Sequence, residues 1–289
     1  MFVSTFETSL DSKGRVSVPA PFRHALEGGV RIFLYPALDG SPCLEGGGDD
    51  DRLFGNDGDD FISGGAGDDF TNGGDGNDTF RGGQDDDNVL VGGAGRDFIN
   101  GGDGSDGVNG SSGNDYLLGS TGDDRLYGGS GDDTLEGGQD NDTLGGPGDD
   151  GLLEGQSGND GLNGGGGDDF MRGGSGDDRL YGGSGADTLE GGTGADLLVG
   201  QSGIDTYLFQ ADWGLDQIAS YGDVASGHAR VDEFIDLSAL GITFDDLTIT
   251  SNGEGGTLVF ITEDGASENA IDILFRPLSE ITEADFFFG

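Results

Sequence analysis

Hydrophobic and polar positions recur with a period of nine residues between residues 46 and 208. In each unit a stretch rich in Gly and Asp precedes one apolar residue that stands between two variable ones, as in Gly-Gly-Ser-Gly-Asp-Asp-Thr-Leu-Glu over 128–136. All eighteen units begin with Gly and have Asp at position six, and seventeen have an apolar residue at position eight. Such self-similarity indicates a repeat architecture.

The glycines at positions one, two and four allow backbone conformations with positive φ, so the first six residues predict a tight turn. The last three residues predict a very short strand with one buried side chain. Such strands are stable only when they stack on the strands of neighbouring units, so two units form one coil and the coils form two parallel sheets. The expected interior is one apolar column, interrupted by Thr71: Leu53, Ile62, Phe80, Val89, Ile99, Val108, Leu117, Leu126, Leu135, Leu144, Leu152, Leu162, Met171, Leu180, Leu189, Leu198 and Tyr207.

Each turn brings one aspartate carboxylate and several backbone carbonyls to an edge of this roll. Six to eight oxygen ligands suit calcium, whereas zinc prefers nitrogen and sulfur, and the chain has only two His and one Cys. Nine turns on each edge leave roughly sixteen gaps for ions. The predicted calcium ligands are the position-six aspartates: Asp51, Asp60, Asp69, Asp78, Asp87, Asp97, Asp106, Asp115, Asp124, Asp133, Asp142, Asp150, Asp160, Asp169, Asp178, Asp187, Asp196 and Asp205.

The repeated unit resembles the RTX, or haemolysin-type, calcium-binding repeat. The resemblance covers residues 46–208 and implies a parallel β-roll with calcium in its turns, in a protein exported without a cleaved N-terminal signal. Three units depart from the pattern, because those at Gly82 and Gly145 have ten residues and that at Gly137 has eight, and Pro147 lies in a turn.

The formal charge of -45 indicates that folding depends on calcium. Self-repulsion of this size opposes compaction, and high Gly content with few apolar residues is typical of disordered chains. Calcium in the turns would neutralise most of the charge, so we expect a chain that is unfolded without calcium and folded with it. Two alternatives are disfavoured. A flexible linker would not repeat an apolar residue so regularly, and phosphate binding by the glycine-rich turns would be opposed by their carboxylates.

The single Cys43 excludes an internal disulfide, and no run of residues approaches the length of a membrane span. Residues 1–10 lack the basic and apolar regions of a secretory signal.

Residues 209–289 predict a C-terminal β cap over the last coil, with strands expected at 206–209, 248–250, 258–262 and 271–275. Residues 232–247 resemble the module that follows the roll in serralysin-type secreted proteins. The ending Asp285, Phe286, Phe287 and Phe288 is similar to the tail that type I secretion machinery reads, which implies extracellular localisation. Packing of the three phenylalanines into the cap is the alternative.

Residues 1–45 resemble one half of the swapped-hairpin DNA-binding fold of MraZ and AbrB regulators. Asp11 to Arg15 matches the Asp-x-x-x-Arg signature of MraZ, and the resemblance implies that Lys13, Arg15 and Arg23 face DNA and that the module oligomerises. Residues 1–45 have four basic and five acidic side chains, however, and the rest of the chain is strongly acidic and would repel a duplex. An inert or oligomerising module, or a fusion of unrelated segments, is the competing interpretation.

The sequence lacks the signs of a catalytic domain. It contains no His-Glu-x-x-His and no Gly-x-Ser-x-Gly motif, and two histidines, His24 and His228, cannot form a three-His zinc site. The outward positions seven and nine vary without a threonine file, which disfavours ice binding and leaves general adhesion open. We therefore predict an all-β, non-enzymatic, secreted calcium-binding roll with the N-terminal module at 1–45. The alternative is a cytoplasmic MraZ-type or AbrB-type regulator with an acidic, calcium-responsive tail.

Overall fold

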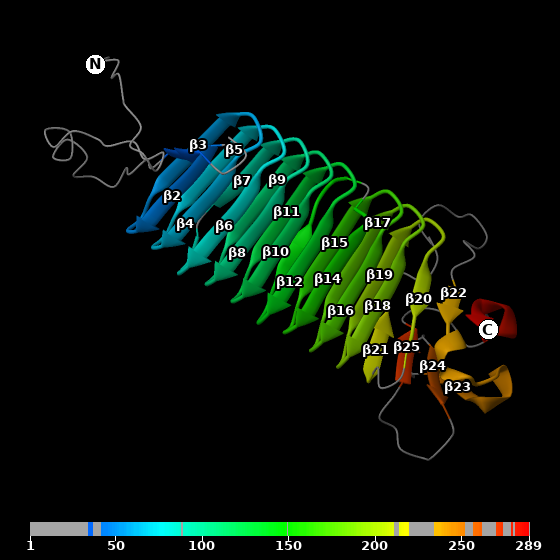
Figure 1. Ribbon diagram of the computed structural model, residues 1–289. Coiled ribbons are helices and arrows are strands. Elements are labelled where there is room, and N and C mark those ends of the chain that lie inside the picture. Colours follow the sequence, from blue (N-terminus) through cyan, green and yellow to red (C-terminus); the bar gives the residue numbers. More distant parts are fainter. Residues whose placement is uncertain are drawn as a thin grey trace, which may run out of the picture.

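The computed structural model describes residues 34–36, 42–87, 89–148, 150–210, 214–219, 234–251, 257–261, 270–273, 279 and 281–288. These residues form an elongated roll whose strands alternate between two parallel sheets, with the N-terminal coils at one end and the C-terminal strands at the other (Figure 1). The predicted all-β parallel roll is confirmed.

The even sheet takes the antiparallel strand β1 and then the even-numbered strands. Its order is β1 (Leu34–Pro36), β2 (Pro42–Gly48), β4 (Phe61–Ala66), β6 (Thr79–Gln84), β8 (Phe98–Asp103), β10 (Tyr116–Thr121), β12 (Thr134–Gln139), β14 (Leu152–Ser157), β16 (Phe170–Ser175), β18 (Thr188–Thr193), β20 (Thr206–Leu208), β22 (Phe234–Asp236) and β26 (Phe286–Phe287).

The odd sheet takes the odd-numbered strands and ends in three C-terminal strands. Its order is β3 (Arg52–Asp57), β5 (Phe70–Asp75), β7 (Val89–Ala94), β9 (Gly107–Ser112), β11 (Arg125–Ser130), β13 (Thr143–Gly145), β15 (Gly161–Gly166), β17 (Arg179–Ser184), β19 (Leu197–Ser202), β21 (Leu215–Ile218), β25 (Ala270–Ile273), β24 (Thr257–Ile261) and β23 (Leu247–Ser251).

Most strands of the roll are six residues long, twice the predicted length. In β12 the pairing with β10 covers Thr134 to Glu136 and resumes at Gly138 and Gln139, so the first glycines of the next unit also belong to the strand. Only positions four to six then form the turn. The glycines continue the sheet because their positive φ bends the chain without breaking the pairing, as at Gly129 with a φ of 107°.

The interior is a single column of buried apolar residues, the core column, which runs from Leu44 to the C-terminal strands. Fifteen of the seventeen predicted members are in it. The prediction was wrong for Val89 and Leu152. Val89 is 37 % exposed and Leu152 is partly exposed, whereas the following residues, Leu90 and Leu153, are fully buried and occupy the column. Both residues lie in ten-residue units. Their aspartates, Asp87 and Asp150, stay buried, so the extra residue lies between the aspartate and the column and moves the next side chain to the other face.

The C-terminal residues cover the end of the roll, as predicted. Strands occur within two residues of the expected positions, and short 3-10 helices lie at Ser238–Leu240, Phe244–Asp246 and Glu283–Asp285. Phe244, Phe286 and Phe288 form an aromatic cluster, with ring centroids 5.8 to 6.4 Å apart, that packs with the core column. No helix in the described ranges is long and apolar enough to cross a bilayer.

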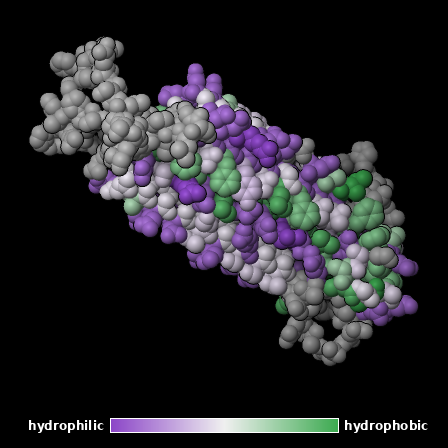
Figure 2. Space-filling view, viewed as in Figure 1, coloured by the Kyte–Doolittle hydropathy of each residue, from purple (hydrophilic) through white to green (hydrophobic). Residues whose placement is uncertain are grey.

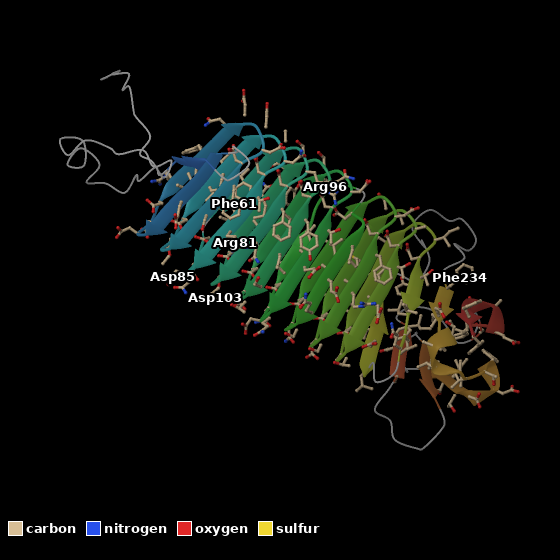
Figure 3. All side chains as sticks on the ribbon, in the orientation of Figure 1. Phe61, Arg81, Asp85, Arg96, Asp103 and Phe234 are labelled. Carbon is tan, nitrogen blue, oxygen red and sulfur yellow. The ribbon has the colours of Figure 1, made fainter. Side chains whose placement is uncertain are left out.

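Figure 2 shows hydrophobic patches in a line along the long axis of the visible face. The outer face of the even sheet carries a row of apolar side chains, from residues that come directly before a core-column residue in the sequence. It includes Phe61, Phe98, Tyr116 and Phe170, and the rings of Phe98 and Tyr116 are stacked with centroids 5.2 Å apart. Figure 3 places Phe61 and Arg81 on this outer face.

Candidate metal sites

All eighteen predicted aspartates are buried, with at most 3 % of each residue exposed. Each lies just before a strand, where the turn enters the sheet. Together they form two stacks, one along each edge of the roll, which we call the aspartate files. Figure 3 shows the two edges: Asp85, in a turn, and Asp103, at the end of β8, lie on one side, and Arg96 lies in a turn on the other.

In fifteen of the eighteen aspartates one carboxylate oxygen joins neighbouring coils. Oδ1 of Asp133 accepts a hydrogen bond from the backbone N–H of Asp115, and Oδ1 of Asp115 accepts one from Asp97. These bonds measure 2.7 to 3.1 Å along both files. Asp60 is an exception, because Pro42, in the coil before it, has no N–H to donate.

The second carboxylate oxygen has no such donor. Buried carboxylate oxygens without hydrogen bonds are costly in a folded protein and indicate a missing cation or other partner. Within the described residues, Oδ2 is buried and unbonded in Asp60, Asp69, Asp78, Asp87, Asp97, Asp106, Asp115, Asp124, Asp133, Asp142, Asp160, Asp178, Asp187, Asp196 and Asp205.

Oδ2 occupies the space that a Cβ at position one of the repeat would need, so this position has to be glycine. A Cβ on Gly119 would lie 2.2 Å from Oδ2 of Asp124 and 2.6 Å from the carbonyl oxygen of Gly137, in the next coil of the same sheet. The same arrangement recurs at Gly55 and Gly110. A carboxylate oxygen and a carbonyl oxygen therefore converge beside each of these three glycines.

Burial raises the pKa of these carboxyl groups above the usual 3.8. Desolvation is the largest cause, and repulsion between neighbouring aspartates adds to it, whereas the backbone hydrogen bonds lower the pKa. The pKa rises to about 7 for Asp106 and to about 8 for Asp142. Without cations, each file is a row of carboxylates that resist ionisation.

The ligand chemistry fits a hard cation held by mixed oxygen donors. No group of three or more His, Cys, Asp or Glu side chains comes together in the described ranges, so backbone carbonyls must supply most ligands of each ion. Calcium accepts many oxygen ligands in flexible geometry, while a strict magnesium octahedron is harder to assemble from carbonyls.

The structure adds a nineteenth buried aspartate, Asp216, which the sequence analysis missed. It lies in β21, its Oδ1 accepts a hydrogen bond of 3.0 Å from the backbone N–H of Asp196, and its Oδ2 is buried and unbonded. Burial raises its pKa to about 8. Gly214, Asp216 and Ile218 match positions four, six and eight of the repeat, and this partial match is the signal that could have revealed it.

Among the other predicted site residues, Lys13, Arg15 and Arg23 fall outside the described residues. Asp285 accepts hydrogen bonds from the backbone N–H and the hydroxyl of Thr282, Phe286 is buried, and Phe287 is 55 % exposed.

Two sheets stacked from short repeats, with buried carboxylates and carbonyls in every turn, define a metal-binding repeat protein of the β-roll class. The chain belongs to the RTX calcium-binding nonapeptide repeat family, whose model matches residues 45–80, 82–117, 109–144, 145–180 and 172–207, more than half of the sequence. This family implies that the repeats bind calcium.

The N-terminal part is similar to a different group of proteins. It is 62 % identical over 50 residues to the transcriptional regulator MraZ of Hyphomonas neptunium, which covers 17 % of this chain and 30 % of that protein. The identity is 48 % over 56 residues with MraZ of Xanthobacter autotrophicus, covering 19 % and 34 % of the two chains. The chain thus spans about a third of the length of the curated relatives it matches.

Two solved structures resemble the roll. One is the AlgE6R3 subunit of a mannuronan C5-epimerase from Azotobacter vinelandii, with a TM-score of 0.37 and 24 % identity, covering 48 % of this chain and 80 % of that chain. The other is the extracellular lipase LipA of Serratia marcescens, with a TM-score of 0.32 and 18 % identity, covering 86 % of this chain and 43 % of that chain.

Proposed function

We propose that this protein is a calcium-dependent roll in which ion binding and folding are one process. The observation that carries the proposal is the row of buried Oδ2 atoms that have no hydrogen bond, many of which, such as that of Asp124, lie near a carbonyl oxygen of the next coil. The aspartates of the two files, with Asp216 at the end of one, would bind the ions, and the carbonyls of neighbouring turns would complete the coordination. Calcium would offset the charge of -45 that opposes compaction.

Far-ultraviolet circular dichroism of the full chain during a calcium titration tests this proposal. From calcium-free buffer to about 10 mM, a range that includes extracellular-type affinities, we expect a cooperative transition from coil to β-structure. Magnesium at the same concentration should produce little of it. A β-rich spectrum in chelator that calcium leaves unchanged would refute coupled folding. Calcium analysis of the dialysed protein counts the ions, against the roughly sixteen that the gaps between turns allow.

We propose that the protein is exported through type I secretion machinery and folds outside the cell. Phe286 and Phe288 are part of the cap, whereas Phe287 is 55 % exposed. The signal residues Asp285 to Phe288 can therefore be tested at Phe287 without disturbing the cap. In a host with type I machinery, Phe287→Ser should reduce the secreted fraction while leaving the calcium-dependent spectrum unchanged. Equal export of Phe287→Ser and the parent chain would argue against this role.

We propose that the roll and its cap have no catalytic activity. In the described part of the chain, the buried carboxyl groups of the roll are the aspartates of the files, Asp216 and Glu190, and the arrangement of the files suits ion binding rather than proton transfer at a pocket. Hydrolysis of ester, peptide or glycosidic substrates by the purified, calcium-loaded chain, lost in an aspartate-file variant, would contradict this proposal.

The similarity to MraZ favours a second candidate, sequence-specific DNA binding by the N-terminal module as an oligomer. A gel-shift assay on direct-repeat promoter DNA tests it, with Arg15→Ala as the variant and Arg96→Ala, an arginine of a roll turn, as the control. Salt-sensitive binding that only Arg15→Ala abolishes would support this candidate. Lack of any shift would leave the calcium roll as the function.

A further inference from the structure

The outer face of the odd sheet, which we call the odd face, differs in charge from the rest of the molecule. In the nine strands β3 to β19, eighteen outward residues flank the core column. Three of them are arginines, Arg52, Arg125 and Arg179, and none is Asp or Glu. The whole chain has 57 acidic and 12 basic residues, so eighteen such positions without an acid stand out against its composition, although β3 and β5 end in the exposed Asp57 and Asp75.

The opposite face has a different pattern although it is built from the same repeat. Among the outward residues of β4 to β20 are Glu136, Glu154 and Glu190. Arg172 lies between two of them, 3.1 Å from Glu190 and 3.6 Å from Glu154. Its charge is therefore neutralised within the sheet. Within the described residues neither Arg125 nor Arg179 has a salt bridge like those of Arg172, and the outward residues that flank the core column beside them on the odd face are not acidic, so their guanidinium groups are available to a ligand.

The two arginines belong to identical segments. Arg125-Leu126-Tyr127 in β11 and Arg179-Leu180-Tyr181 in β17 occupy the same positions of the repeat. The register links them through β13 and β15, three strand steps apart, which is about 14 Å at the usual spacing of strands. Each segment presents one guanidinium group beside one phenol ring, and we call the two segments the Arg-Tyr pairs.

Small residues separate the Arg-Tyr pairs. Thr143, Gly145, Gly161 and Asn163 are the outward residues of β13 and β15. β13 ends at Gly145, because Pro147 has no N–H to continue the pairing. A hollow of about 830 Å³ results, lined among others by Arg125, Tyr127, Thr143, Gly145, Pro147 and Asn163. The irregular unit thus creates a depression beside Arg125 and Tyr127, while Arg179 and Tyr181 lie outside its lining, in a later strand of the same sheet.

We propose that this hollow and the Arg-Tyr pairs bind an acidic oligosaccharide, a chain of uronate sugars. Arginine forms paired hydrogen bonds with carboxylates, and two arginines about 14 Å apart would bind carboxylates on two separated sugars. The exposed ring of Tyr127 offers a flat apolar surface to a pyranose ring, and the amide of Asn163 offers donors and acceptors to hydroxyl groups. A shallow groove with a few convergent polar groups is the usual form of such a site.

A nucleic acid fits this surface less well. Its phosphates are densely spaced, whereas the odd face has few cations, and the turns on both edges are acidic. A neutral sugar would leave the arginines without partners. Sparse cations, the exposed phenol ring of Tyr127 and the hollow beside it match a ligand with one carboxylate per ring.

The inference rests on the folded roll, which calcium stabilises under the proposed function. Binding is therefore measured on the full chain in saturating calcium, and circular dichroism of the same sample reports the fold. The probes for isothermal titration calorimetry are a short oligogalacturonate, a neutral maltooligosaccharide of equal length and single-stranded DNA. Sodium chloride at about 150 mM suppresses unspecific attraction.

We expect the oligogalacturonate to bind and the other two probes to bind about tenfold more weakly or not at all. Arg125→Gln with Arg179→Gln should weaken binding by about tenfold or more, and so should Tyr127→Ala with Tyr181→Ala. Arg81→Gln, an exposed arginine of the opposite face, is the matched control and should bind like the parent chain. Calcium could also bridge a uronate to carboxylates of the protein. Such binding would not depend on the odd face, so the double arginine variant would then bind like Arg81→Gln.

Three results would overturn the proposal: no oligogalacturonate binding by a chain whose spectrum shows the folded roll, equal loss in Arg81→Gln and the double arginine variant, or tighter binding of DNA than of oligogalacturonate. Failure of calcium-dependent folding would instead appear as an unchanged spectrum, which separates it from failure of the binding site.

Discussion

The backbone N–H of Asp115 donates a hydrogen bond of 2.8 Å to Oδ1 of Asp133, one coil further along the roll. This bond uses only one oxygen of the carboxylate and leaves Oδ2 for a cation. The aspartate files therefore join the coils by a backbone hydrogen bond and, under the proposed function, also by a shared ion.

Asp133→Asn keeps the shape of the side chain and removes its charge. We expect the protein to fold only at a higher calcium concentration and to bind at least one ion fewer, because a neutral amide is a weaker calcium ligand than a carboxylate. Asp132→Asn, the exposed neighbour in the same turn, removes the same charge without altering the file. A calcium titration followed by circular dichroism compares the two, and identical midpoints would contradict the role of Asp133.

Folding without calcium should depend on pH. The raised pKa values, about 7 for Asp97, Asp106 and Asp178 and about 8 for Asp142, mean that the folded roll holds protons that the unfolded chain, with pKa values near 3.8, releases. Stability then falls as pH rises between about 4 and about 8. In calcium-free buffer we expect β-structure at the acidic end of this window and its loss toward pH 8.

In saturating calcium the dependence should reverse, because ions replace the protons. Calcium binding at pH 7 should release protons, and acidification should release calcium. Circular dichroism across the pH window and proton release in weakly buffered solution measure both effects. A calcium-free spectrum that is constant from about pH 4 to about pH 8 would contradict the raised pKa values.

Gly119→Ala should damage one turn specifically. The added Cβ would lie 2.2 Å from Oδ2 of Asp124, so the carboxylate or the backbone has to move. We expect destabilisation of about 1 to 3 kcal/mol in calcium, together with a higher calcium midpoint. Gly161→Ala is the control, because the nearest atom to its Cβ would be 3.9 Å away. Thermal unfolding in saturating calcium should separate the variants, and equal melting temperatures would be evidence against this packing.

Thr71→Val should stabilise the roll. Thr71 is a member of the core column, between Leu53 and Leu90, and its hydroxyl is buried without a hydrogen bond in the described part of the chain. Removing an unsatisfied hydroxyl is worth about 1 to 3 kcal/mol. Thr79→Val, at an outward position, should change stability by less than about 0.5 kcal/mol. Denaturant unfolding in calcium gives both values, and a destabilised Thr71→Val would show that the hydroxyl has a partner.

The sequence by itself determined most of the fold and the residues of the aspartate files. A nine-residue period with one apolar position permits one way of burying that side chain, so the column from Leu53 to Tyr207 and the eighteen buried aspartates followed from spacing alone. The N-terminal residues Lys13, Arg15 and Arg23 and their role stay a prediction.

The tertiary structure decided what happens where the period is broken or ends. Leu90 and Leu153, rather than Val89 and Leu152, enter the column because the backbone keeps Asp87 and Asp150 in the aspartate files and places the extra residue beyond them. Asp216 joins a file because β21 pairs in parallel with β19, although the chain before it has left the repeat. The register of the coils likewise brings Arg125 and Arg179 onto one face. Local spacing determines which side chain can be buried, but stacking between coils determines which side chains meet.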